Sequence, residues 1–256
     1  VPGRRSGIAA LARSRMPLAD ESPIRKLAAN FDRTQVIYID GIRHAYEIAT
    51  LAYTRLRATL TAIAGMEKDF EPLFTAAFLD AWAAIDAIDR FRQLWDQAPA
   101  AMKAKLSDDS PAFDNELREL RNINDHIATR VSRVVAQKSA AMGVITWFTA
   151  INADPPEGLL CAIVPGTLRD AALHIPTLNG RRMEWPTGAI RLEAGGHSAC
   201  LCDAFPILGQ RVAALEESLG EFNSKLPEDT EWAGADMLLK IHAAFDGEIY
   251  AAPPHG

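Results

Sequence analysis

The longest stretch of helical periodicity in the sequence, from Ser110 to Met142, sets a length that other parts of the chain have to match. Ser110 is a favourable N-cap, Pro111 suits the first helical position, and Gly143 breaks the pattern. At 1.5 Å per residue, such a helix is about 45 Å long and needs partners of similar length. Its apolar residues recur at helical spacing: Phe113, Leu117, Leu120, Ile127, Val131 and Val134.

Two earlier segments and one later segment show the same period. The first runs from about residue 34 to 64 and is followed by Gly65, and the second runs from about 71 to 98 with Pro72 in its first turn. The later segment runs from about 205 to 222. The sequence therefore predicts four helices, of which the first three have comparable lengths.

Between the third and fourth helical segments the sequence becomes β-branched, aromatic and rich in glycine and proline. Residues 144–151 and 159–165 are typical of strands, and residues 188–202 are typical of two short strands joined at Gly195–Gly196. A further short helix is expected near Met237–Phe245.

These elements predict a mainly α fold, an antiparallel four-helix bundle with a small antiparallel β insert between the third and fourth helices. Met16 opens a more usual beginning, so residues 1–15 are expected to be an addition that takes no part in the fold. The predicted units are an N-terminal extension (1–33), a helical core (34–142), the β-rich insert (143–204), the fourth helix (205–226) and a C-terminal segment (227–256).

Charge and composition exclude several classes of partner. The formal net charge of -6 gives no overall attraction to nucleic acid, so a nucleic-acid substrate requires a local basic patch. Three cysteines are too few for a disulfide scaffold and fit a reducing compartment. No apolar run reaches the ~20 residues of a membrane helix, and the run Ile8–Ala12 is too short for a secretory signal. A cytoplasmic protein without a membrane partner is expected.

A dense polar cluster, Arg121, Asn122, Asp125 and His126, interrupts the long third helix. On a helical wheel the last three lie about 120° or more from the centre of the apolar stripe, and Arg121 lies on its shoulder. Asn122 and His126 are one turn apart on one face, and Arg121 and Asp125 are a second such pair. Two interpretations are open, an ordinary solvated face, which is the commoner case, or a functional site.

The string Arg121-Asn122-Ile123-Asn124-Asp125-His126 resembles the R-x(4–6)-H motif of the HEPN superfamily. Arg169–His174 and Arg191–His197 match the same loose spacing but lie in the β-rich region, so only the first lies on a long helix. The resemblance implies a HEPN-like helical core over residues 34–142, paired as a homodimer in which two motifs face each other. Many HEPN members are metal-independent ribonucleases, including toxins and defence factors, whereas others only bind or assemble.

The resemblance to the ribonuclease members implies endoribonuclease chemistry in which the RNA 2′-OH is the nucleophile and neither metal nor cofactor takes part. His126 would be the general acid or base, and Arg121 would hold the scissile phosphate. Asn122 would orient the imidazole or the phosphate, and Asp125 would steer Arg121 or favour protonation of His126.

The same resemblance implies the partners of the chain. Arg118 and Arg130, on either side of the motif, would guide the RNA backbone. A second copy of the chain, an RNA substrate, and a cognate antitoxin or another protein are the expected partners.

A zinc site is a weaker candidate. Cys200 and Cys202 alternate along a predicted strand close to His197, and Cys161 lies on another predicted strand. Four ligands of these types can bind zinc, but structural sites usually have a C-x2-C spacing, and free cysteines are often small buried apolar residues.

Other groups have ordinary structural interpretations. Arg43 and His44, beside Glu47 on the first helix, have the residue types to complete a cleft, but an exposed helix surface is the preferred prediction. Two functions from other classes stay open: a non-catalytic HEPN-like module that binds a protein partner or nucleotide through the same face, and a zinc-stabilised interaction protein.

Overall fold

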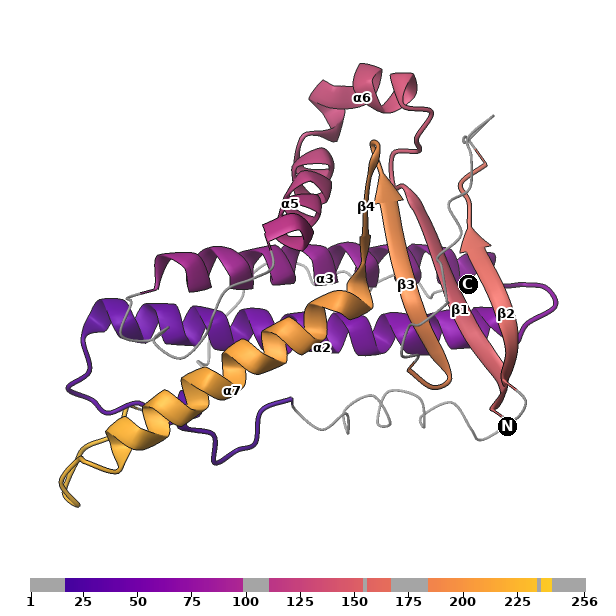
Figure 1. Cartoon of the computed structure of the whole chain (residues 1–256). Helices are drawn as coiled ribbons and strands as arrows, with labels where there is room; N and C mark the ends of the chain where they lie inside the picture. The colour runs from indigo at the N-terminus through magenta and orange to yellow at the C-terminus, as the bar shows by residue number, and fades with distance from the viewer. Residues whose placement is uncertain (1–16, 99–110, 154–155, 167–183, 234–235, 241–256) are drawn as a thin grey trace, which may run out of the picture.

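The computed structural model describes residues 17–98, 111–153, 156–166, 184–233 and 236–240 (Figure 1). It is a mixed α/β fold, with two long packed helices, a four-stranded antiparallel sheet and a C-terminal helix. In chain order the elements are η1 (Pro23–Arg25), α2 (Arg33–Ala64), α3 (Glu71–Gln97), α5 (Pro111–Asp125), α6 (Ile127–Ala136), β1 (Val144–Ala153), β2 (Pro156–Ile163), β3 (Thr187–Ala194), β4 (His197–Cys200), η2 (Leu201–Asp203) and α7 (Ala204–Asn223).

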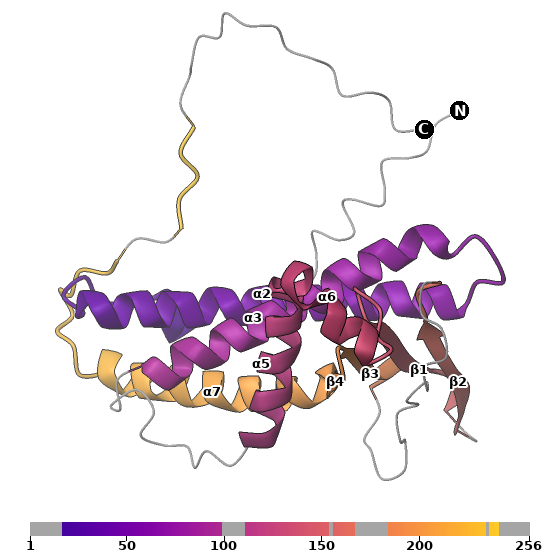
Figure 2. The same ribbon diagram turned by 90° about the horizontal axis from the view of Figure 1, so that it is seen from above.

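Helices α2 and α3 form an antiparallel pair, and α7 and the sheet lie on the same side of it (Figure 2). Asp32 caps the start of α2, where its carboxylate accepts hydrogen bonds from the backbone N–H groups of Thr34 and Gln35 at 3.0 and 3.1 Å. The facing surfaces of the two helices are apolar. Side chains with no exposed surface include Ile39, Ile42, Leu56 and Leu60 on α2 and Ile85 and Phe91 on α3.

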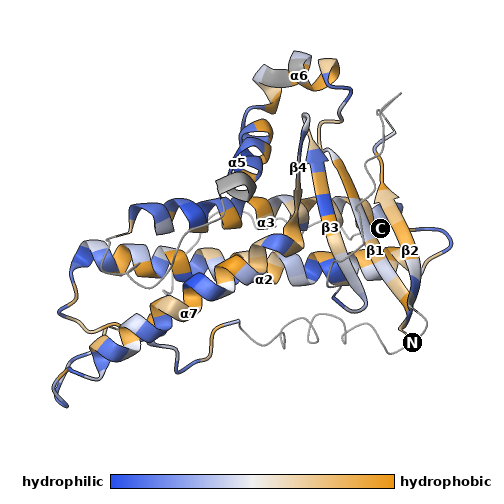
Figure 3. Ribbon diagram, in the orientation of Figure 1, coloured by the Kyte–Doolittle hydropathy of each residue, from blue (hydrophilic) through white to orange (hydrophobic). Residues whose placement is uncertain are grey.

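The strands form a sheet in the order β2-β1-β3-β4, with every neighbouring pair antiparallel. Gly195 and Gly196 join β3 to β4 with φ values of 55° and 82°, as tight hairpin turns require. Helix α5 packs beside β4, one edge of the sheet. The other edge is β2, and no described strand pairs with its outer side. Hydrophobic residues follow much of β1 and β2 (Figure 3).

A chain of hydrogen bonds joins the sheet to α2. Arg57 donates from Nε to the Thr187 carbonyl at 2.8 Å and from Nη2 to the Trp185 carbonyl at 2.9 Å. Thr61, one turn further along α2, has its hydroxyl 2.7 Å from Thr187 Oγ1, which lies 2.8 Å from Thr149 Oγ1 on β1. Because Thr149 and Thr187 are buried, these bonds satisfy polar groups that water does not reach, and they fix β1 and β3 against the helix.

Helix α7 covers the α2–α3 pair through aromatic contacts. The Phe205 ring stacks on Tyr53 of α2 with 4.3 Å between ring centroids. The Arg211 guanidinium lies over the Trp95 ring of α3, 5.8 Å from its centroid. The fourth predicted helix is therefore confirmed, within two residues at each end.

Residues 17–32, which the sequence assigns to an extension, belong to the folded protein. Leu18, Ile24 and Leu27 are buried in the common core. The backbone N–H of Ala29 donates to the Glu231 carbonyl at 2.8 Å, so this segment also pairs with the chain that follows α7. The prediction failed because a short irregular segment has no periodic pattern to mark it as buried.

The predicted third helix is two helices, with the break at His126. Helix α5 ends at Asp125, and α6 begins at Ile127 and lies across the top of α5 (Figure 1). Asn122, Asn124 and Asp125 precede the break, and such side chains compete with helical backbone hydrogen bonds.

The β3–β4 hairpin tip fills the space that the break creates. Gly195 lies against Ile123 of α5, and its backbone N–H donates to Ser139 Oγ at 2.9 Å. Gly196 lies against the Gln137 side chain. A straight helix would carry residues 137 and 139 away from the hairpin, so the tertiary contact requires the change of direction.

The predicted order of helices and strands is confirmed, including the hairpin at Gly195–Gly196. The sheet is not an insert beside a separate bundle, however, because α5 packs on β4 and α2 packs on β1 and β3. Of the expected helix near residues 237–245, residues 237–240 are not helical, and residues 241–245 lie outside the described residues.

Gly195→Ala is expected to lower the free energy of unfolding by about 2–4 kcal/mol. A Cβ at this positive φ would overlap the Ile123 side chain, so backbone strain and overpacking add. Urea unfolding followed by circular dichroism measures the change.

Gly209→Ala is the matched control, because a Cβ there meets nothing and lies in the interior of α7. It should raise the free energy of unfolding by about 0.5–1 kcal/mol. Equal effects of the two substitutions would contradict the packing of the hairpin on α5.

Candidate functional site

Arg121, the centre of the predicted motif, lies against three carboxylates. Its Nε is 3.4 Å from Asp86 Oδ1 and 3.6 Å from Asp89 Oδ2, both on α3, and its Nη2 is 3.2 Å from Asp125 Oδ2. The residue is half-buried between α3 and α5. Its ion pairs therefore link the two helices.

Asp89 explains why a guanidinium is needed at this place. Its side chain has no exposed surface, and a buried carboxylate is costly unless it is paired and hydrogen-bonded. Arg92 donates to Asp89 Oδ1 at 2.9 Å, and Gln93 donates to Oδ2 at 2.5 Å. Arg121 adds positive charge on the second oxygen, so it completes the neutralisation of Asp89.

The other predicted catalytic residues are spread around this ion-pair network. Asn122 is half-buried on α5, Asp125 is exposed at the end of α5, and His126 is exposed in the turn between α5 and α6. Arg118 is exposed on α5, whereas the side chain of Arg130 lies outside the described part of the chain. Arg121 and Asp125 do pair at i,i+4, as predicted, but His126 does not continue the helical face of Asn122.

This arrangement has a clear electrostatic consequence. Phosphate binding by Arg121 would bring a further anion to a guanidinium that already faces three carboxylates. The network can hold α5 on α3, but it opposes the approach of an RNA backbone.

The four zinc ligands considered from the sequence do not meet. Cys161 lies on β2 and Cys200 at the end of β4, the two outer strands of the sheet, so three strand spacings of about 4.8 Å separate them. His197 Nδ1 is 3.3 Å from Glu116 Oε2 of α5. Among the described residues, Cys200 and Cys202 converge instead with Asp203.

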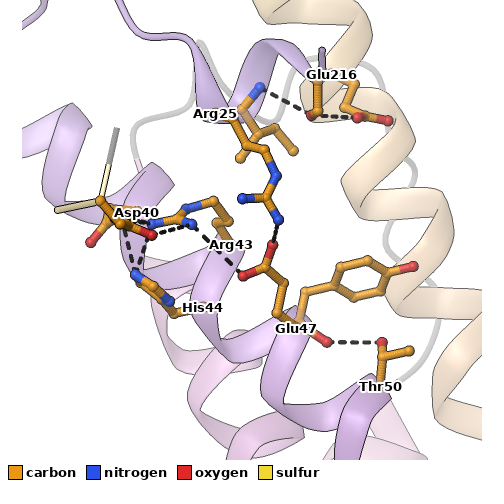
Figure 4. A network of polar contacts seen from close by, with 11 residues as sticks. Arg25, Asp40, Arg43, His44, Glu47, Thr50 and Glu216 are labelled. Atoms are coloured by element: carbon orange, nitrogen blue, oxygen red, sulfur yellow. Dashed lines mark hydrogen bonds and ion pairs between the residues drawn. The ribbon is translucent and has the colours of Figure 1, made fainter. Parts of the chain in front are cut away.

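A second ionic network, on α2, was misjudged from the sequence. Arg43 is buried although it was predicted to be exposed, and its guanidinium contacts Asp40 Oδ1 at 2.8 Å and Glu47 Oε2 at 3.7 Å (Figure 4). Glu47 also pairs with Arg25 of η1. The spacing of residues 40, 43 and 47 signals local ion pairs, but nothing local signals burial.

Asp236, which is far away in sequence, completes this network. Arg43 donates from Nη1 to Asp236 Oδ2 at 3.0 Å and from Nη2 to Asp236 Oδ1 at 2.9 Å, a bidentate pair. These hydrogen bonds hold the pKa of Asp236 below its ordinary value. The pairing therefore holds above that ordinary value and is lost as the pH falls through the lowered pKa.

A pocket of about 730 Å³ lies where η1, α2 and the segment after α7 meet. Its lining mixes apolar side chains with charged ones, of which Arg43 pairs with both Asp40 and Asp236. Arg25 Nε, on the pocket wall, is buried without a hydrogen-bond partner. Trp232, Ala233 and Asp236, from the segment after α7, form part of its lining.

Two exposed apolar groups lie close in sequence to the two residues of the Arg43–Asp236 pair. Ile37, Ile48 and Leu51 share the outward face of α2 and are 61%, 51% and 45% exposed; they are called the α2 stripe here. The tail run is Met237, Leu238 and Leu239, which follow Asp236 directly and are 91%, 81% and 79% exposed.

Comparisons with protein-family models, characterised proteins and solved structures find no match for this chain. Within the described residues, no helix has the length and apolar character to cross a membrane. The site is therefore interpreted from its own chemistry.

Arg121→Ala is expected to lower the free energy of unfolding by about 1–2 kcal/mol, because Asp89 keeps Arg92 but loses its second cation. Urea unfolding near neutral pH measures the effect.

Arg118→Ala removes an exposed arginine from the same helix and serves as control, with an expected change within about 0.5 kcal/mol. If Arg121→Ala leaves the free energy of unfolding unchanged, the guanidinium does not stabilise the α3–α5 contact.

Proposed function

We propose that this protein is a non-enzymatic interaction module that pairs with a second copy of itself through the α2 stripe and the tail run. The observation that carries the proposal is the exposure of three consecutive large apolar side chains, Met237, Leu238 and Leu239, beside a helix with an exposed apolar face. Contiguous exposed apolar surface of this kind is typical of an interaction site.

The Arg43–Asp236 pair explains why the two surfaces act together. Asp236 is fixed to α2 by a bidentate ion pair, so the tail run starts beside the helix that carries the stripe. Arg43 lies between Ile37 and Ile48 in the sequence of α2. The tether limits how far the tail run can diffuse from α2, which raises its effective concentration near this helix.

A second copy is the partner that the surfaces themselves favour. Each copy carries both an apolar segment and an apolar helix face, so two copies related by a twofold axis can cover both surfaces reciprocally. The contact would be of the helix-in-groove or segment-on-helix kind, in which apolar anchors at helical spacing supply most of the affinity.

Leu238→Asp and Ile48→Asp test this pairing from its two sides. The wild-type chain should dimerise as its concentration is raised to about 100 µM. Each substitution should raise the dissociation constant of the dimer at least tenfold, because it places a charge in an apolar contact. Sedimentation equilibrium of the full chain measures the dissociation constant.

Met66→Asp is the matched control, because Met66 is an exposed apolar residue just beyond the other end of α2. It should leave the dissociation constant unchanged. A wild-type chain that stays monomeric over this range would rule out pairing, and would leave the tail run to fold back on its own α2 or to bind another protein.

A HEPN-like bundle with metal-independent endoribonuclease activity is the second candidate, as the motif resemblance implies. One observation favours it: His126 is exposed in a turn, and Val131 and Val135, five and nine residues further along, are exposed on α6. An apolar patch beside the histidine is what a seam between two motifs requires. The three carboxylates around Arg121 weigh against it.

The ribonuclease candidate predicts that purified protein cleaves single-stranded RNA in the presence of EDTA and that His126→Ala lowers the rate by at least a hundredfold. Gel electrophoresis of end-labelled RNA follows the cleavage. His44→Ala, which removes another exposed histidine, should leave the rate unchanged. Equal cleavage by the wild type and His126→Ala would exclude this site.

A further inference from the structure

The two cysteines at the end of the sheet come together because the chain changes direction between them. Cys200 is the last residue of β4, and the 3-10 turn Leu201–Asp203 starts directly after it. An extended strand would hold alternate Cα atoms about 6.6 Å apart, near the upper limit for a disulfide. A 3-10 turn advances only about 2.0 Å per residue, so it shortens this separation.

The sulfur atoms of this pair are already in contact. Cys200 Sγ and Cys202 Sγ are 2.7 Å apart, and the two residues do not form a disulfide. The bond length of a disulfide is about 2.05 Å, so closing it requires less than about 1 Å of further approach. Cys161 does not compete, because it lies on the opposite edge strand.

The two thiols differ in their access to solvent. Cys200 is buried, whereas Cys202 is half-buried and its thiol lies 3.6 Å from Asp203 Oδ1. An oxidant from solution can therefore reach Cys202 first, and Cys200 is placed to react with the product. Redox-active pairs have this division between an accessible thiol and a resolving thiol.

We infer that Cys200 and Cys202 are a redox-sensitive pair that closes to an intramolecular disulfide when the protein meets a hydroperoxide. The Cys202 thiolate attacks the peroxide oxygen, and the O–O bond breaks to give a sulfenic acid and, with a proton, an alcohol or water. The Cys200 sulfur then attacks the Cys202 sulfur and displaces hydroxide, which leaves as water with the Cys200 proton. Two thiols are oxidised, and one peroxide is reduced.

The surroundings set the conditions under which this pair responds. A hydrogen bond with Cys200, burial, and the nearby Asp203 carboxylate all raise the pKa of Cys202. Because the thiolate is the nucleophile, the reaction becomes faster as the pH rises. At a given pH, the raised pKa leaves less thiolate, so the reaction is slower than that of an ordinary thiol.

The position of the pair gives the disulfide a structural effect. The disulfide would restrain the segment that joins β4 to α7, because η2 is the whole of that segment. Cys202 packs against the core beside the start of α7, where Phe205 stacks on Tyr53. Oxidation would therefore restrain the junction between the sheet and the helix that covers α2 and α3.

Treatment of the 256-residue chain with hydrogen peroxide, followed by peptide mass spectrometry, tests the inference. The peptide that contains both residues should lose the mass of two hydrogen atoms, and dithiothreitol should restore it. Thiol titration should fall from three reactive groups to one in the unfolded protein. In the Cys161→Ser variant, peroxide should convert both remaining thiols to the disulfide. In the Cys202→Ser variant, no intramolecular disulfide should form.

Three results would overturn the inference. The first is a gain of oxygen atoms without loss of hydrogen in the Cys200–Cys202 peptide, and the second is oxidation of Cys161 instead. The third is stoichiometric zinc in the purified protein that is released only when both thiols are alkylated. Because the wild-type peptide carries the decisive signal, the outcome does not depend on whether a cysteine variant folds.

Discussion

Two helices as long as α2 and α3 cannot bury their apolar faces against each other alone, and this constraint governs the rest of the molecule. Each helix has a buried face wider than one partner can cover. Helix α7, the η1 segment and the sheet bury the remaining apolar surface. Polar groups at these contacts form hydrogen bonds or ion pairs with one another. Arg57 and Thr61 meet Thr187 at the sheet, and Arg121 meets Asp89 beneath α5. Arg57, Arg121 and Asp89 are therefore explained by the need to close this core.

The same constraint changes the meaning of the polar cluster on α5. A motif with an arginine and a histidine at the right spacing can arise because a buried carboxylate on a neighbouring helix needs a cation. Asp89 supplies that reason for Arg121, independently of any substrate. His126 has no such structural partner among the described ion pairs, and its place in a turn rather than on a helical face follows from the hairpin that packs below. A role for His126 thus requires a partner surface, whereas Arg121 has a structural role already.

The sequence predicted local elements well and their tertiary context poorly. Periodicity located α2, α3 and α7, and alternation with a Gly-Gly pair located the hairpin, because these signals arise within a few residues. The break at His126 depends on contacts with Gly195 and Ser139, more than ten residues away, so a helical wheel could not reveal it. The burial of Arg43 depends on Asp236, which is 193 positions away along the chain. For the candidate sites, the sequence indicates which residue types are present. The tertiary fold determines which of these residues come into contact.

The unequal edges of the sheet limit how copies of this chain can associate through strands. Helix α5 seals the β4 edge, and among the described strands only β2 has an outer side without a partner. Any extension of the sheet can therefore take place in one direction only. Two copies joined along their β2 strands would form a continuous eight-stranded sheet with a sealed edge at each end. Both free β2 edges are used in such a pair, so edge-to-edge addition through the described strands would stop at two copies.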